Sequence, residues 1–401
     1  MRLALGLLTL GLAALPVLAH SEILPNGDCA GVYWDLTAVF DSGDRIYARV
    51  LVTRAGPGDR NAASLGHWFE PDGTRTPFQN GRGEGRFEFS PTGQPVRPSL
   101  GSASLRAEDR LHLRIGSTRL DLGDAVHHFA VDNDKRGVKL LVSVEVPTGS
   151  EPAPIFAGDL EVELVALGGR TTARVWRTGM DTPRSLRGWT TLVRTRHAAC
   201  EHSLAVRRVD VHRLGPEGPW LLIHQQLANG VEQSWLGWRA AGGVLRSLRP
   251  DEVAFEDWRA NAAGSPLPQR LRPKSHELRG SIGIGAVHLS IDPLDALPRL
   301  VRMLYWFGAS PRRIWADATS ELTSSAPETL PRGAVIASFT FLHPPDDPTR
   351  SSFRDPGGSD VALADRRSEQ PPRRAPRAGR VGRIRGAAAA SRRRSRRDRE
   401  R

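Results

Sequence analysis

Side chains suited to acid–base chemistry are concentrated in one stretch near the middle of the chain. This stretch contains His197, Cys200, Glu201, His202, Asp210, His212 and His224. On an extended strand, His202, Asp210 and His212 share parity and could point into one barrel, with His224 contributed by the neighbouring strand. Imidazole and carboxyl groups can exchange protons near neutral pH. The candidate catalytic residues are therefore Asp210, Glu201, His202, His212 and His224, and the alternative is that they are half-exposed strand residues without a chemical role.

The spacing of these residues does not match a tight metal-ligand motif, so we expect no metal site. The sequence also lacks the G-x-S-x-G, H-E-x-x-H, Walker and C-x-x-C patterns. We therefore expect no cofactor, and any catalysis would depend on side chains alone.

Tryptophan is abundant, with ten residues in the chain. Its large apolar ring and polar N–H suit either a β-barrel core or the wall of a pocket for an apolar ligand. The candidate ligand-binding residues are Trp34, Trp189, Trp235 and Trp306, with ordinary core packing as the alternative.

Most of the chain between residues 30 and 342 has the alternating pattern of β-strands. The segments 32–40 and 46–52 alternate around an Asp41–Asp44 turn, which predicts a hairpin with one apolar face. Further strand-sized segments are 201–214, 220–227, 232–239, 244–248, 282–291 and 334–341, and Gly168-Gly169 is among the turn signals. The sequence predicts an all-β protein made of two consecutive antiparallel β-barrels.

The two ends of the chain differ from this body. Arg2 and the apolar run that follows, ending in Val17 and Ala19, predict a signal peptide over residues 1–19 and hence a secreted or periplasmic protein. The predicted domains cover residues 20–183 and 184–345. Residues 346–401 are predicted to form a disordered Arg-rich tail, for which binding to an anionic membrane surface, a passive role and a gene-model artefact are alternatives.

The formal net charge of +12 comes entirely from the last 36 residues, which contain 15 arginines and three acidic residues. The remaining 365 residues carry 41 basic and 41 acidic side chains. A neutral body lacks the clustered positive charge of a nucleic-acid-binding surface, so no nucleic-acid partner is expected. Cys29 and Cys200 could form a single disulfide or remain free, because pairing cannot be deduced from sequence.

Three short segments carry a resemblance to a known family. Gly31-Val32-Tyr33-Trp34-Asp35-Leu36, Gly188-Trp189 and Met303-Leu304-Tyr305-Trp306-Phe307 occur in an order and spacing that resemble the AttH/CrtC group of tandem-lipocalin proteins. That group includes hydroxyneurosporene synthase, also called carotenoid 1,2-hydratase, and is related to the survival-factor-like lipocalins. The resemblance spans Gly31 to Leu342 and implies two calycin barrels with a cavity for an isoprenoid or lipid-like molecule.

Three functions are compatible with these patterns. The first is binding of an apolar, isoprenoid or lipid-like molecule in a Trp-lined barrel. The second is a hydro-lyase of the carotenoid 1,2-hydratase type, which the resemblance implies and in which Asp210 or Glu201 would protonate an alkene. The third is an envelope module that binds carbohydrate on exposed aromatic rings.

Overall fold

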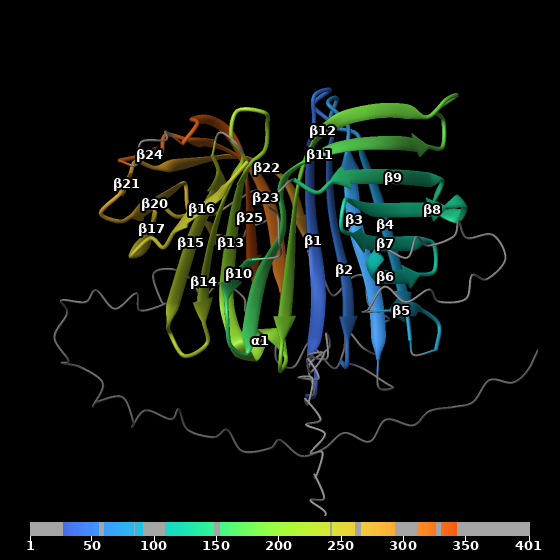
Figure 1. Cartoon of the computed structure of the whole chain (residues 1–401), viewed down its shortest axis with the longest axis horizontal. Coiled ribbons are helices and arrows are strands. Elements are labelled where there is room, and N and C mark those ends of the chain that lie inside the picture. The colour runs from blue at the N-terminus through green and yellow to red at the C-terminus, as the bar shows by residue number, and fades with distance from the viewer. Residues whose placement is uncertain are drawn as a thin grey trace, which may run out of the picture. The chain divides into compact units, whose positions relative to one another are not determined.

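The computed structural model describes residues 27–55, 60–83, 85–90, 109–147, 153–240, 243–260, 266–292, 311–325 and 330–342. The predicted signal peptide, the predicted Arg-rich tail and Trp306 lie outside these residues. The described residues are almost all β, in two curled antiparallel sheets (Figure 1). The all-β fold with two consecutive barrels is therefore confirmed. Within the described residues, no helix has the length and hydropathy needed to cross a membrane.

The first sheet runs in the order β4-β3-β2-β1-β12-β11-β9-β8-β7-β6-β5, with β10 paired to β11. Its strands are β1 (Gly31–Phe40), β2 (Arg45–Thr53), β3 (Asn61–Phe69), β4 (Arg75–Arg82), β5 (Glu88–Ser90), β6 (Asp109–Ile115), β7 (Thr118–Gly123), β8 (Val126–Asn133), β9 (Val138–Glu145), β10 (Ala153–Phe156), β11 (Leu160–Arg177) and β12 (Arg184–His197), with the 3-10 turn η1 (Asp134–Arg136) before β9. Figure 1 shows β6–β9 running across the direction of β1–β4. Hydrogen bonds from Ser64 and Asn80 to Thr118 then join the two ends of the curled sheet.

The second sheet runs in the order β16-β15-β14-β13-β25-β23-β22-β20-β17. Its strands are β13 (Ala205–Arg213), β14 (Trp220–Leu227), β15 (Glu232–Arg239), β16 (Leu245–Leu248), β17 (Glu252–Glu256), β20 (Arg270–Lys274), β22 (Ile282–Ile291), β23 (Arg312–Ser320) and β25 (Gly333–Phe341). Two small pairs accompany it, β18 (Arg259–Ala260) with β19 (Pro266–Leu267) and β21 (Leu278–Arg279) with β24 (Thr323–Ser324). Each sheet encloses its own apolar core on its concave face.

The predicted hairpin is present as β1 and β2, but both faces of β1 are buried rather than one. Val32, Trp34 and Leu36 pack into the first core. Asp35, which has the opposite parity, is also buried because this face of β1 packs against the second sheet. The predicted apolar face is therefore present, and it packs in the first core. Burial of the opposite, mostly polar face could not be predicted, because sequence alternation does not reveal a second packing partner.

Two local predictions need correction. The strand predicted over 201–214 begins four residues later, because Glu201–Leu204 form the short helix α1 before β13. The predicted turn at Gly168-Gly169 is an irregularity within the long strand β11, where the register with β12 shifts. Gly168 has a φ of +65°, and a side chain there would collide with Pro219. Glycine is required at this point because the backbone is left-handed and Pro219, in the connection between β13 and β14, approaches closely.

The last strand of the first sheet ends at His197, whereas the second predicted domain begins at Arg184. β12 begins at Arg184 and pairs with both β1 and β11, so it belongs entirely to the first sheet. The first strand of the second sheet is β13, which begins at Ala205. Pairing of strands does not show which segments fold independently, so the domain boundaries at residues 183 and 345 stay predictions.

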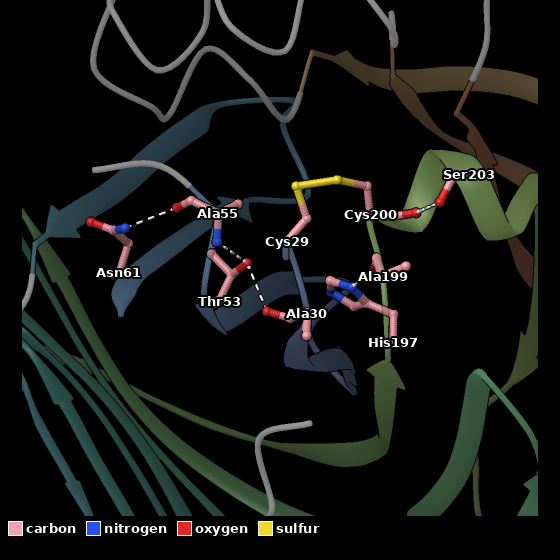
Figure 2. Close-up of a disulfide and its surroundings, with 9 residues drawn as sticks. All are labelled: Cys29, Ala30, Thr53, Ala55, Asn61, His197, Ala199, Cys200 and Ser203. Atoms are coloured by element: carbon pink, nitrogen blue, oxygen red, sulfur yellow. Dashed lines mark hydrogen bonds between the residues drawn. A yellow bond between two sulfur atoms is a disulfide. The ribbon is translucent and has the colours of Figure 1, made fainter. Parts of the chain in front are cut away.

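A disulfide joins Cys29, just before β1, to Cys200, just before α1 (Figure 2). The two residues are separated by 171 positions in the sequence. The turn around them is held by hydrogen bonds from the Ser203 hydroxyl to the Cys200 carbonyl and between His197 Nδ1 and the Ala199 carbonyl oxygen. The disulfide therefore fixes the start of β1 beside the connection between the two sheets.

Reduction of this disulfide should lower the free energy of unfolding by about 2–5 kcal/mol, because a long loop in the unfolded chain is released. Chemical denaturation with and without reductant measures the effect. The chain has two cysteines, so a Cys29→Ala/Cys200→Ala variant should lose the same stability and should not respond to reductant. Equal stability of the oxidised wild type and this variant would contradict the prediction.

Candidate functional site

Polar side chains of strand β13 point to opposite faces of the second sheet, because successive residues of a strand alternate in direction. Val209 and Val211 pack into the core of the second sheet, and Arg207 lies on this same concave side against Phe255. Arg208 and Asp210 have the opposite parity and pair with each other, and Arg208 also donates to Thr195 of the first sheet. The residues between the two sheets form one cluster, and those around Arg207 form another.

The cluster between the sheets is centred on Asp35 of β1. The Arg49 guanidinium donates two hydrogen bonds to the Asp35 carboxylate, at 2.8 and 2.7 Å, and Arg313 Nη1 of the second sheet donates a third at 2.5 Å. Burial by itself raises the pKa of Asp35, but the guanidiniums of Arg313 and Arg49 hold it well below its usual range. Asp35 is therefore an ionised carboxylate that links the two sheets.

A second ion pair lies beside it on β13. Arg208 Nε donates to Asp210 Oδ1 at 2.7 Å, and Arg208 Nη1 donates to the Thr195 hydroxyl of the first sheet at 2.8 Å. His212 is buried two residues further along, and burial lowers the pKa of its imidazole to about 4. His212 is thus neutral near pH 7, and its Nδ1 makes no hydrogen bond.

Glu201 joins this cluster from α1, directly after the disulfide-bonded Cys200. The Tyr33 hydroxyl donates to Glu201 Oε1 at 2.5 Å, and the Arg49 guanidinium lies 3.8 Å from the centre of the Tyr33 ring. Burial, followed by the negative charge of Glu201, raises the pKa of Tyr33 well above its usual range. Tyr33 is therefore a neutral hydrogen-bond donor rather than a base.

The second cluster lies on the concave face of the second sheet. The Arg207 guanidinium lies 4.3 Å from the centre of the Phe255 ring, and its Nη2 donates to Glu232 Oε1 at 3.2 Å. Phe255 also stacks on Trp258, with ring centres 6.0 Å apart. Phe255 and Trp258 are half-buried, so this cluster combines a buried cation with aromatic surface near the solvent.

His224 of β14 completes this second cluster. Its ring makes a T-shaped contact with the Phe255 ring, with centres 5.1 Å apart, and its Nδ1 lies 3.0 Å from the Ser234 hydroxyl. The side chain is 1% exposed, and Nε2 has no hydrogen-bond partner. Burial, followed by the positive charge of Arg207, lowers the pKa of His224 to about 3. His224 therefore presents a neutral imidazole nitrogen that is buried without a partner.

The structure does not gather the predicted catalytic residues in one barrel. Asp210, His212 and Glu201 lie in the cluster between the sheets, whereas His224 lies inside the second sheet and His202 is in α1. The expectation fails because Asp210 and His212 face the first sheet instead of the barrel interior. Their roles as acid or base stay predictions.

The candidate tryptophans are also separated. Trp34 is in the first core, and Trp235 packs in an apolar cluster between the sheets with residues of β11 and β14. Trp189 is half-buried on β12 opposite Val39. Their ligand-binding roles stay predictions.

Sequence reasoning overlooked Arg207, Phe255 and Glu232 around His224, and Asp35, Arg49 and Arg313 between the sheets. Arg207 shares the inward-facing parity of Val209 and Val211, which was the available signal, since a charge is rarely buried unless it is paired. Asp35, Arg49 and Arg313 have the parity opposite to the core residues of their strands, so alternation gave no signal that they are buried. Within the described residues, no group of three or more His, Cys, Asp or Glu side chains is arranged to hold a metal ion.

Replacing Asp35 by Asn should lower the free energy of unfolding by about 3–5 kcal/mol, because Arg49 and Arg313 would remain buried without their carboxylate. Urea denaturation at pH 7 measures the loss. The matched control is Glu252→Gln, which breaks the exposed ion pair with Lys274 and should cost less than about 1 kcal/mol. Similar losses in the two variants would contradict a central role for Asp35.

Stability should also fall as the pH is lowered from about 6.5 to 5. Burial lowers the pKa of four histidines below the unfolded value of 6.5, to about 4 or about 3, namely His67, His212, His224 and His288. In this range the unfolded chain takes up protons that these native residues do not, which favours unfolding. His112 acts in the opposite sense because its pKa is raised.

The His212→Gln variant should remove one of these contributions and reduce the slope of stability against pH by up to about 1.4 kcal/mol per pH unit. Denaturation curves at several pH values measure the slope. His276→Gln, at an exposed position, is the control and should leave the slope unchanged. An unaltered slope in His212→Gln would show that this imidazole titrates normally in the native protein.

Two solved structures have a fold similar to that of this chain. A candidate AttH protein from Nitrosomonas europaea is 13% identical, with a TM-score of 0.53 over 78% of this chain and 92% of its own. CghA, determined with Sch210972, is 12% identical, with a TM-score of 0.50 over 79% of this chain and 89% of its own. No protein-family model and no curated protein matches the sequence. The chain therefore shares the lipocalin-like, two-sheet fold of these proteins.

Proposed function

We propose that the protein binds an apolar small molecule that carries a polar group, on the concave face of the second sheet. The observation that carries this proposal is the buried His224 Nε2, which makes no hydrogen bond. A polar atom buried without a partner costs about 1–3 kcal/mol. Such a cost is readily explained at a binding site, where the ligand supplies the missing partner.

The surroundings of His224 suit the apolar part of such a ligand. Phe255 and Leu248 are partly buried and pack against the continuous apolar core of the second sheet. Trp258 extends the aromatic surface beyond Phe255. Aromatic and aliphatic walls with a few placed polar groups are typical of small-molecule sites. The fold supports the proposal by analogy, since CghA was determined with Sch210972.

A surface module that stacks sugars on exposed rings has less support. The nine tryptophans of the described residues are all buried or half-buried. The half-buried rings of Phe255 and Trp258 lie beside the buried polar side chains of Arg207 and His224. This arrangement favours a site that encloses part of its ligand.

Secretion to an oxidising compartment is part of the proposal. The Cys29–Cys200 disulfide is typical of secreted or periplasmic proteins. The apolar run before His20 supports the same localisation. The test therefore uses protein produced by export, with the disulfide intact.

Binding can be tested with N-phenyl-1-naphthylamine, a neutral apolar fluorophore, titrated into delipidated full-length protein. We expect saturable fluorescence enhancement that is weakened about tenfold or more in Phe255→Ala, which removes the aromatic surface beside His224. Phe89→Ala is the matched control, because Phe89 is partly buried against the core of the first sheet and should leave binding unchanged. Absence of saturable binding, or sensitivity to Phe89 instead of Phe255, would overturn the proposal.

A further inference from the structure

The position of Arg207 bears on the chemical class of the ligand, provided that the proposed binding function holds. Arg207 is 7% exposed and faces the concave side of the second sheet together with Val209 and Val211. Phe255 covers one plane of its guanidinium. The N–H donors of a guanidinium point outward in its own plane, so an aromatic ring over the guanidinium does not take the place of a hydrogen-bond acceptor.

Glu232 occupies one of these donor positions. Its contact with Arg207 Nη2 is 3.2 Å, and the Glu232 side chain is 36% exposed, whereas that of Arg207 is 8% exposed. A carboxylate at the solvent edge can rotate into water at little cost, while a buried guanidinium cannot. Glu232 is therefore an exchangeable carboxylate partner, and it marks a position where a carboxylate from a ligand would fit.

The imidazole of His224 supplies a second hydrogen-bond donor, in addition to the Arg207 guanidinium. Both Arg207 and His224 contact the ring of Phe255, so the two side chains lie against the same aromatic ring. When the Ser234 hydroxyl donates to His224 Nδ1, the proton of the neutral imidazole is on Nε2. In this tautomer the unpartnered nitrogen is a donor, which matches an acceptor oxygen on the ligand.

We infer that the ligand is an amphiphilic carboxylic acid, such as a long-chain or isoprenoid acid, whose carboxylate displaces Glu232 from Arg207 and accepts a hydrogen bond from His224 Nε2. The apolar chain contacts Phe255, Trp258 and Leu248. A guanidinium binds a carboxylate through two parallel hydrogen bonds, a geometry that gives the head group its specificity. The exchange is neutral in charge, because one carboxylate replaces another beside the same cation.

The test compares ligands that differ only in their head group. Dodecanoate, 1-dodecanol and dodecylammonium are each titrated to displace N-phenyl-1-naphthylamine from the full-length wild-type protein. We expect dodecanoate to bind at least about tenfold more tightly than 1-dodecanol, and dodecylammonium to bind no better than the alcohol. Equal affinity for the acid and the alcohol would overturn the inference and leave the proposed binding function standing. Failure of the fluorophore itself to bind would overturn the proposed function.

Two variants then locate the head group. Arg207→Gln should abolish the preference for dodecanoate and leave the affinity for 1-dodecanol unchanged. Arg213→Gln is the matched control, because Arg213 lies at the other end of β13 beside Glu217 and should keep the preference. An Arg207→Gln variant that still prefers the acid would contradict this location.

Glu232→Gln provides a readout that a purely structural role of Arg207 would not give. Removal of the competing carboxylate should tighten dodecanoate binding several-fold, with no change for 1-dodecanol. The substitution is at an exposed position, so the variant should fold normally. Weaker or unchanged dodecanoate binding in Glu232→Gln would contradict the exchange of carboxylates.

Discussion

The two sheets are joined by the ion pairs that the Asp35 carboxylate makes with Arg49 and Arg313. This carboxylate accepts hydrogen bonds from Arg49 of its own sheet and from Arg313 of the other, so one buried anion neutralises charges on both sides. A buried ion pair contributes little net stability compared with an apolar packing, but it is costly to break. The geometry of the interface is therefore specified by a charge arrangement rather than by hydrophobic burial alone.

This interface explains why β1 and β13 are buried on both faces. One face of each strand packs in the core of its own sheet, and the other face lies against the opposite sheet. Polar side chains on the two faces that meet between the sheets have partners across the interface, as in the contact of Arg208 with Thr195. The cluster between the sheets thus resembles a structural network, in which most charged groups are satisfied by one another.

The cluster around His224 differs because it reaches solvent. Its cation is paired with a partly exposed carboxylate, and its imidazole nitrogen has no partner. The half-buried rings of Phe255 and Trp258 extend this incomplete arrangement toward solvent. His212 Nδ1 between the sheets also lacks a hydrogen bond, but the residues around it are buried. The contrast between an enclosed cluster and one that reaches solvent is the physical reason for placing binding inside the second sheet.

The period-two alternation of the sequence was sufficient to predict the all-β class, the β1–β2 hairpin and segments such as Trp220–Leu227, because strand formation is read from local pattern. Alternation also grouped Asp210 with His212, but it could not decide which face of β13 meets the second core and which meets the first sheet. The bulge at Gly168 was likewise indistinguishable from a turn. Only the tertiary structure decided these points, because both sides of such a strand are buried and partners distant in sequence determine which side meets which core.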